Sequence, residues 1–422
     1  MEYKEKEIKK GIKLHLINTD KFKTNLVSVF LTTEISRENV TKNAVISALL
    51  RRGSKTMPST EKISKTMEEM YGAAFDCGLD KTGDNQVLKF YLETINDEFL
   101  PQKDENMLKT SLEKLFEIVF NPYLENDIFK KEYVEQEKNT IKQRIEGKID
   151  NKARYSIDRC IEEMYKGKPY GLYKFGYIED LENIDEKNLY QYYKELINNC
   201  KIDIFVSGIL DDEIYKIVEQ DENIKKLKDR DAKYVQKGEE HKEEVNEKTV
   251  TETMDVTQGK LILGLDVNLS DEDSKYDTLI YNAILGGTAN SKMFQNVREK
   301  AHLAYVASSS YLRFKNNIFI NCGIKIENYE KALKIIREQI SDMEKGDFDE
   351  EDIKNSKQTI VATIKTIQDE QDTEITYYFG QELAKTKTTI EEYIKRIEKV
   401  KKEDIIKVAK NVRINTIYFL RR

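Results

Sequence analysis

Two side chains in the last third of the sequence could act together on a peptide carbonyl. Arg298 and Tyr305 lie seven residues apart, where a predicted helix runs into a predicted strand. A guanidinium and a phenol held on a rigid turn can bind a carbonyl oxygen or stabilise an oxyanion. The alternative is that Arg298 is an ordinary surface residue and Tyr305 an ordinary core residue.

The residues that most often bind metals are scattered along the chain. The three histidines are His15, His241 and His302. No two of them have the spacing of zinc ligands on a helix or hairpin, so the sequence contains no local zinc site. The four cysteines are Cys77, Cys160, Cys200 and Cys322. They form no Cys-x-x-Cys pair or disulfide framework, and we expect each to be a small core residue.

Composition favours a soluble, cytoplasmic protein. A chain of 422 residues can form two or more domains with ample core. It contains no apolar run near the roughly 20 residues that cross a bilayer, and its first residues lack the apolar segment of a signal peptide. The net charge is −7, with basic residues interspersed among acidic ones. We therefore expect neither membrane nor nucleic acid as a partner.

The chain contains two copies of one pattern of predicted elements. In the first copy these are a strand at 25–33, a helix at 44–53, a helix entering a strand at 59–77, a strand at 86–94, a helix at 108–119, a long helix from 127, a helix at 186–198 and a strand at 202–208. The second copy has them at 260–269, 276–287, 291–307, 317–326, 332–343, from 352, 402–411 and 416–420.

This duplication predicts an α+β fold with two homologous domains in tandem. Each domain should be a mostly antiparallel sheet covered on one face by helices. We predict domains at 1–218 and 252–422, joined by a linker at 219–251 that is too charged to pack as core. Two such domains on a connector suggest the halves of a clamshell, although a tandem of independent domains fits the same pattern.

The segment from Val297 to Ser310 closely resembles the Arg/Tyr motif of the insulinase-like zinc peptidases. That family includes pitrilysin and the mitochondrial processing peptidase. Lys168-Pro169-Tyr170-Gly171, followed by Gly176, is similar to a His-Pro-Tyr-Gly element of the family. The resemblance covers nearly the whole chain and includes the duplication and the element order.

The resemblance also identifies where the zinc motif has been lost. Family members carry H-x-x-E-H on the first helix of the N-terminal half, where two histidines bind zinc and the glutamate activates water. Aligned on Leu-Leu-Arg-Arg-Gly, this chain has Ala44 and Ala48 in place of the histidines and Ser47 in place of the glutamate. Alanine has no donor atom, and a serine without a partner is a poor general base.

The resemblance places the third zinc ligand of the family at Glu137. This residue follows Val134 by three positions and precedes Ile141 by four, so it lies on the apolar stripe of its helix. One interpretation is a remnant ligand, and the other is a carboxylate paired with a nearby Lys or Arg. We favour the pair, because one carboxylate cannot hold zinc alone.

Some members of the family divide the work between two subunits, one with H-x-x-E-H and one with the Arg/Tyr pair. The resemblance implies that this chain is the second kind, inactive alone and part of a cytoplasmic heterodimer that cleaves unfolded peptides. The partner would hold the zinc, and this chain would have no cofactor and no catalytic residue of its own. Arg298 and Tyr305 would bind the substrate. The isolated chain could form a homodimer. The alternative function is a non-enzymatic peptide-binding or scaffold protein.

Overall fold

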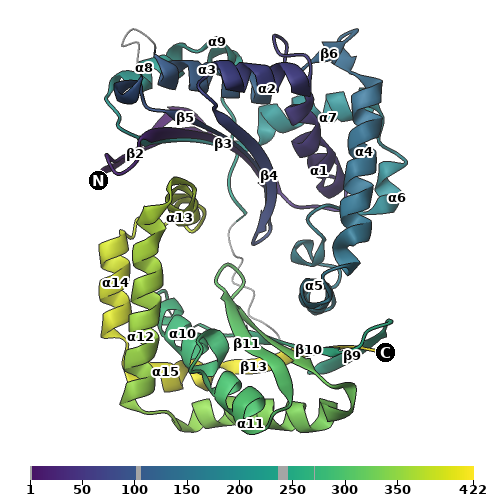
Figure 1. Cartoon of the computed structure of the whole chain (residues 1–422), viewed down its shortest axis with the longest axis vertical. Coiled ribbons are helices and arrows are strands. Elements are labelled where there is room, and N and C mark those ends of the chain that lie inside the picture. Colours follow the sequence, from purple (N-terminus) through teal and green to yellow (C-terminus); the bar gives the residue numbers. More distant parts are fainter. Residues whose placement is uncertain (1, 101–105, 236–245, 270) are drawn as a thin grey trace. The chain divides into compact units, whose positions relative to one another are not determined.

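The computed structural model describes residues 2–100, 106–235, 246–269 and 271–422, which divide into two compact units (Figure 1). The first unit comprises Met1–Gly147, Leu172–Gln236 and Gln371–Phe379. The second comprises Lys148–Gly171, Lys237–Glu370 and Gly380–Arg422. Each contains one large, mostly antiparallel sheet and several helices, which confirms the predicted α+β class.

The sheet of the first unit has six strands. In spatial order they are β1 (Glu2–Lys9), β2 (Ile12–Asn18), β8 (Lys201–Gly208), β3 (Thr24–Glu34), β5 (Asn85–Ile95) and β4 (Ala74–Thr82). Only the β2–β8 pair is parallel. Along β3 the side chains of Val27, Val29 and Leu31 belong to the core beneath the helices, because alternate residues of a strand share one face.

The helices of the first unit enclose that core. They are α1 (Val40–Leu49), α2 (Thr60–Glu69), α3 (Met107–Phe120), α4 (Lys131–Glu146), α6 (Ile178–Leu181), α7 (Glu186–Asn199), α8 (Glu213–Gln220) and α9 (Glu222–Lys226), with a small ribbon of β6 (Leu124–Glu125) and β7 (Ile128–Phe129). The predicted apolar stripe of α3 is buried, from Leu108 to Val119. A buried stripe at helical spacing is what fixes such a helix against a sheet.

The second unit repeats this arrangement. Its strands, in spatial order, are β11 (Ala304–Leu312), β12 (Asn317–Ile324), β10 (Gly259–Val267), β13 (Val412–Arg421) and β9 (Lys248–Thr253). Its helices are α5 (Lys152–Met164), α10 (Ser274–Asn282), α11 (Tyr329–Lys345), α12 (Glu350–Lys365), α14 (Ile390–Lys399) and α15 (Lys402–Ala409). Strands β9, β13, β10, β12 and β11 occupy, in that order, the places of β2, β8, β3, β5 and β4 in the first sheet. The pair β9–β13 is parallel, as β2–β8 is in the first sheet. The strand order therefore reproduces the duplication predicted from the sequence.

The first sheet is also covered on its other face, by a helix from the second half of the chain. This helix is α13 (Gln371–Leu383), most of which belongs to the first unit. The ring of Phe379 packs edge-on against Phe30, with ring centres 4.9 Å apart. The side-chain amide of Gln371 donates a hydrogen bond to the Ser207 carbonyl at 3.0 Å. The central strands β8, β3 and β5 are thus buried on both faces.

The second sheet receives a helix from the first half in the same way. Helix α5 packs on β10 and β13, and Gly264 of β10 makes this close approach possible. A Cβ atom at Gly264 would lie 3.3 Å from Cys160 Sγ, tighter than most real contacts. Arg159 of α5 donates to the Glu252 carboxylate at 3.0 Å. Because α5 follows α4 as α13 follows α12, the two exchanged helices are corresponding elements of the two copies.

The segment 219–251 differs from the exposed linker that its charge suggests. Part of it forms α9 and β9, and residues 236–245 lie outside the described residues. Arg230 and Tyr234 are buried, and the Tyr234 hydroxyl donates to the Asp203 carboxylate at 2.6 Å. Composition alone misses this, because a few apolar and aromatic side chains are enough to attach a charged segment to a core.

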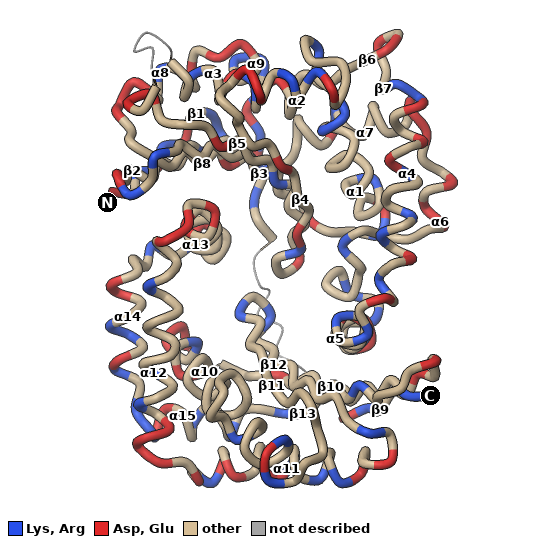
Figure 2. Tube along the Cα trace, in the orientation of Figure 1, with Lys and Arg blue, Asp and Glu red and all other residues tan. Residues whose placement is uncertain are grey.

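Charged residues of both signs are mixed along several helices. Lysine and arginine alternate with aspartate and glutamate along α4, α12 and α14 (Figure 2). Within the described ranges, none of the helices combines the length and apolar content that crossing a bilayer requires.

We expect the stability of the protein to fall as pH rises, because of Glu374 on α13. This side chain is 1% exposed, its Oε1 has no hydrogen-bond partner among the described residues, and burial raises its pKa to about 7. In the unfolded chain the carboxyl ionises near pH 4.5. Between these values the folded state retains a proton that the unfolded state has lost, so the free energy of unfolding decreases with pH, by about 3 kcal/mol in total.

Glu374→Gln should remove this loss. Urea unfolding between about pH 4 and pH 8 should show a flatter profile for the variant and a gain of about 1–3 kcal/mol at pH 8. Asp372→Asn, an exposed change on the same helix, is the matched control and should retain the wild-type slope from about pH 5 upward. A wild-type pH profile in Glu374→Gln would contradict the assignment.

Candidate functional site

The first candidate site lies on α1, where the zinc motif of the resemblance would be. Ala44, Ser47 and Ala48 are 1%, 5% and 6% exposed. The two alanine side chains belong to the apolar core and offer no metal ligand. Nearly every residue of the helix is buried, and Ser47 and Ala48 also line a cavity.

Ser47 has a structural partner. Its hydroxyl donates a hydrogen bond to the Gly78 carbonyl of β4 at 3.2 Å. The Cys77 thiol in turn donates to the Ser47 carbonyl at 3.4 Å. Ser47 therefore ties α1 to the edge strand β4, and neither bond supplies a base that could activate it.

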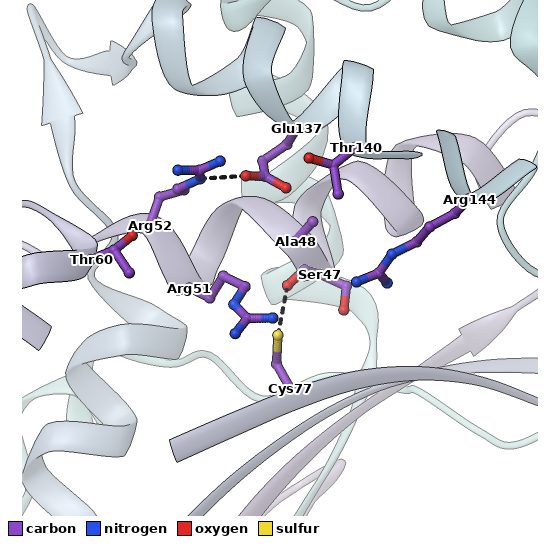
Figure 3. A pocket seen from close by; sticks show the side chains of 9 residues that line it. All are labelled: Ser47, Ala48, Arg51, Arg52, Thr60, Cys77, Glu137, Thr140 and Arg144. Carbon is purple, nitrogen blue, oxygen red and sulfur yellow. Dashed lines mark hydrogen bonds and ion pairs between the residues drawn. The ribbon is translucent and has the colours of Figure 1, made fainter. Parts of the chain in front are cut away.

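Glu137 on α4 is paired with an arginine. Its side chain is 4% exposed and forms an ion pair with the guanidinium of Arg52, which directly follows α1 (Figure 3). The Arg52 side chain is 31% exposed. The structure thus contains the charge-paired carboxylate, which was the favoured alternative to a remnant zinc ligand.

These residues line a cavity of about 270 Å³ within the first unit. Its lining consists of Ser47, Ala48, Arg51, Arg52, Thr60, Cys77, Glu137, Thr140 and Arg144. Sequence reasoning did not find Arg51 or Arg144 as site residues. The available signal was the pair Arg51-Arg52 directly before Gly53.

Neither redox nor nucleophilic chemistry is favoured at Cys77. Burial raises the pKa of its thiol to about 11, although nearby Arg51 lowers it in part. The thiol is therefore protonated near neutral pH, and the thiolate is the reactive form. In the part of the chain that the structure describes, no group of three or more His, Cys, Asp or Glu side chains could hold a metal ion. His241 lies outside that part.

The second candidate site lies in the second unit and contains Arg298. This residue is in η6 (Phe294–Lys300), a π-helical segment that leads towards β11. Its guanidinium lies 4.6 Å from the centre of the Phe294 ring, and its Nε is 3.4 Å from the Glu299 carboxylate. The side chain is 45% exposed, so its charge remains accessible. Single π-helical turns occur often at functional positions.

Tyr305 is the most exposed large aromatic residue among those described. It is 68% exposed, and its neighbour Val306 is 49% exposed. Pairing of β11 with β12 skips Tyr305, since Ala304 faces Ile324 and Val306 faces Gly323. The extra residue is a β-bulge on an edge strand, which redirects a side chain away from the regular pleat. Within the described residues no hydrogen bond joins Tyr305 to Arg298.

The glycine pair that precedes this segment packs against the sheet. A Cβ atom at Gly286 would lie 2.7 Å from the backbone nitrogen of Ser309 on β11, a distance that real side chains do not reach. The glycine allows η5 (Ala283–Gly287) to contact the strand directly. The helix predicted at 276–287 therefore ends against the sheet.

Known proteins resemble this chain in both sequence and fold. The family described as "Peptidase M16 inactive domain" matches residues 183–360. A protein of Bacillus subtilis (strain 168), "Probable inactive metalloprotease YmfF", is 36% identical over 413 residues, covering 97% of this chain and 96% of that protein. A conserved protein from Enterococcus faecalis V583 has a solved structure with a TM-score of 0.89 and 27% identity, covering 100% of this chain and 99% of that one.

The fold recurs in more distant structures. A peptidase M16 inactive domain from Pseudomonas fluorescens has a TM-score of 0.81 at 16% identity, with 100% of this chain and 98% of that one covered. Fold and sequence together define an inactive peptidase-like protein. The chain belongs to the M16 peptidase family, and the resemblance inferred from the sequence is confirmed.

We expect Arg52→Gln to destabilise the first unit. The change would leave the nearly buried Glu137 carboxylate without its counter-charge. Removing one partner from a fully buried pair costs about 3–5 kcal/mol, and the partial exposure of Arg52 reduces this to about 2 kcal/mol. Urea unfolding is the measurement, with Glu137→Gln added to Arg52→Gln as the compensating variant. Lys109→Gln, from an exposed pair with Glu113, is the control and should change stability by less than about 0.5 kcal/mol. An equal loss in the compensated double variant would argue against the pairing.

We also expect the chelator-treated chain to bind no stoichiometric zinc, because Ala44, Ser47 and Ala48 supply no nitrogen ligand and no general base. Calorimetric zinc titration with elemental analysis measures this. The variant carrying Ala44→His, Ser47→Glu and Ala48→His should bind zinc at least about tenfold more tightly, since two imidazoles would join Glu137. One tightly bound zinc per wild-type chain would overturn the expectation.

Proposed function

We propose that this chain is the non-catalytic, substrate-binding subunit of a two-subunit zinc peptidase that acts on unfolded peptides. A homologous partner with an intact H-x-x-E-H motif would supply the zinc and the general base. This chain would supply Arg298 and Tyr305. Its own catalytic position holds alanines and an Arg52–Glu137 ion pair, so activity without a partner is not expected.

The exposure of Tyr305 is the observation that carries this proposal. A phenol ring would normally be buried against a sheet, because each buried aromatic side chain stabilises the fold by about 1.5–3 kcal/mol. Here a bulge leaves the ring 68% exposed, beside a segment that leaves the Arg298 charge accessible. Two donors of this kind are suited to the negative charge that develops on a carbonyl oxygen during peptide hydrolysis.

The strand edges support an extended peptide as the substrate. Strands β4 and β11 each lie at the end of a sheet and pair with only one neighbour. The unpaired backbone groups of an edge strand can bind an extended peptide by adding it as a further strand. An unfolded peptide offers such a backbone, and a folded protein does not.

The second candidate function is a peptide-binding or scaffold protein with no part in hydrolysis. The Arg52–Glu137 pair favours it, since it stabilises a site that no longer performs chemistry. In this case Arg298 and Tyr305 would bind peptide without affecting any rate.

We expect Tyr305→Phe or Arg298→Ala to slow the assembled complex by about 10²-fold in kcat, by analogy with the loss of one oxyanion donor. The complex would be formed with a homologue that retains H-x-x-E-H and is recovered by co-purification. Tyr305→Phe removes only the hydroxyl and keeps the volume of the ring, so its effect on kcat should exceed its effect on KM. The melting temperature of each variant, measured on the same preparation, separates a functional loss from a structural one.

Tyr71→Phe and Arg396→Ala are matched controls at other exposed positions, and each should leave kcat unchanged. A wild-type rate from a folded Tyr305→Phe, Arg298→Ala double variant would remove the oxyanion role and favour the scaffold function.

A further inference from the structure

The cavity of the first unit is basic where a metal ion would otherwise provide the positive charge. Three arginines line it, Arg51, Arg52 and Arg144, together with the single carboxylate of Glu137. Three positive charges against one negative charge leave a net charge of +2 within about 270 Å³. This excess contrasts with the alternating charges along the helices (Figure 2).

Two of these guanidinium groups are available for a ligand. Arg52 is engaged by Glu137, whereas neither Arg51 nor Arg144 forms an ion pair with any residue that the structure describes. Figure 3 shows their side chains extending towards Ser47, one from the segment after α1 and one from α4. Arg144 also lies over the Phe175 ring, 5.5 Å from its centre, which restricts its orientation.

Two of the three hydroxyl groups in the lining, those of Ser47 and Thr140, already donate within the protein. The Ser47 hydroxyl donates to Gly78, and the Thr140 hydroxyl donates to the Gln136 carbonyl at 3.1 Å. The principal unused donors in the cavity are therefore the N–H groups of Arg51 and Arg144. Guanidinium forks of this type bind planar oxyanions in a bidentate manner.

Strand β4, beside the cavity, indicates which class of molecule would carry the anionic group. Cys77 lines the cavity from β4, the edge strand, and Phe75 and Leu79 share its face. A peptide added to the free edge of β4 would direct alternate side chains to this same face, beside the cavity. A carboxylate is the anionic group that a peptide itself provides.

We propose that this cavity binds a carboxylate of an extended peptide lying along β4, with Arg51 and Arg144 as its two ligands. The carboxylate is that of an Asp or Glu side chain or that of the peptide C-terminus. This inference rests on the peptide binding proposed above and adds a preference for acidic peptides. It concerns binding by the chain alone, so the experiment needs no partner and no zinc. A negative result here would leave the oxyanion role of Tyr305 intact.

The experiment measures fluorescence anisotropy of labelled extended peptides with the full-length chain. One peptide carries a central Glu, a second carries Gln at that position, and each is made with a free and with an amidated C-terminus. The free-acid Glu peptide should bind at least about tenfold more tightly than the amidated Gln peptide, because a charge-assisted hydrogen bond contributes about 1.5–3 kcal/mol. The amidated Glu peptide and the free-acid Gln peptide each retain one of the two carboxylates, so their affinities identify which carboxylate is bound. Weaker binding on loss of either carboxylate supports the proposal.

Arg51→Gln and Arg144→Gln should each reduce this preference by about five- to tenfold and leave the affinity for the neutral peptide unchanged. Lys142→Gln is the matched control, since it removes a positive charge from the same helix outside the cavity. Arg51 and Arg144 are both exposed, so we expect both variants to fold.

Equal affinity for acidic and neutral peptides would overturn the proposal, as would a preference that survives in the Arg51→Gln, Arg144→Gln double variant. Inorganic phosphate is the competing probe. Tight phosphate binding that depends on both arginines, combined with no preference among the peptides, would make the cavity a phosphate site and would also overturn the carboxylate assignment.

Discussion

The central strands of both sheets are buried on both faces, and this constraint governs the rest of the molecule. Each sheet has its own layer of helices on one face, and on the other it receives one helix from the opposite half of the chain. Phe30 and Phe205 lie under α13, and Gly264 lies under α5. Without those helices, large aromatic and apolar surfaces would face water, at a cost of about 25 cal/mol per Å². The two halves of the sequence share one pattern of elements, but each unit includes a helix from the opposite half. Neither half alone therefore contains a complete unit.

The periodic spacing of apolar residues made much of this fold predictable from the sequence. It did not predict which elements pack against one another. The two copies could be predicted because apolar residues recur at spacings that match one buried face, as from Leu108 to Val119. The same spacings did not indicate which sheet would bury a helix such as α13. Sequence-local patterns contain no information on pairing between segments hundreds of residues apart. The same reason explains why the segment at Arg230 and Tyr234 was expected to be exposed.

The candidate site was predictable to the extent that it depends on residue types missing from a known pattern. Alanines at positions 44 and 48 exclude a zinc ligand directly. The ion pair and the group of arginines in the cavity were harder to predict. Arg52, Glu137 and Arg144 come from separate segments and meet only in the folded unit. A buried carboxylate such as Glu137 needs a counter-charge, since an unpaired buried charge costs several kcal/mol. Arg52 meets that need, which leaves the other two arginines as an excess.

The side chains of the two candidate sites differ in their exposure to solvent, and this difference bears on function. On α1 the small residues Ala44, Ser47 and Ala48 are buried, and the Ser47 hydroxyl donates to Gly78 of β4. At Tyr305 a bulge and a π-helical segment instead keep an aromatic ring in solvent, against the usual preference for burial. Departures of this kind from regular structure are common where a side chain is presented to a ligand. The second unit therefore presents its two candidate side chains to solvent, whereas the candidate residues on α1 of the first unit are buried.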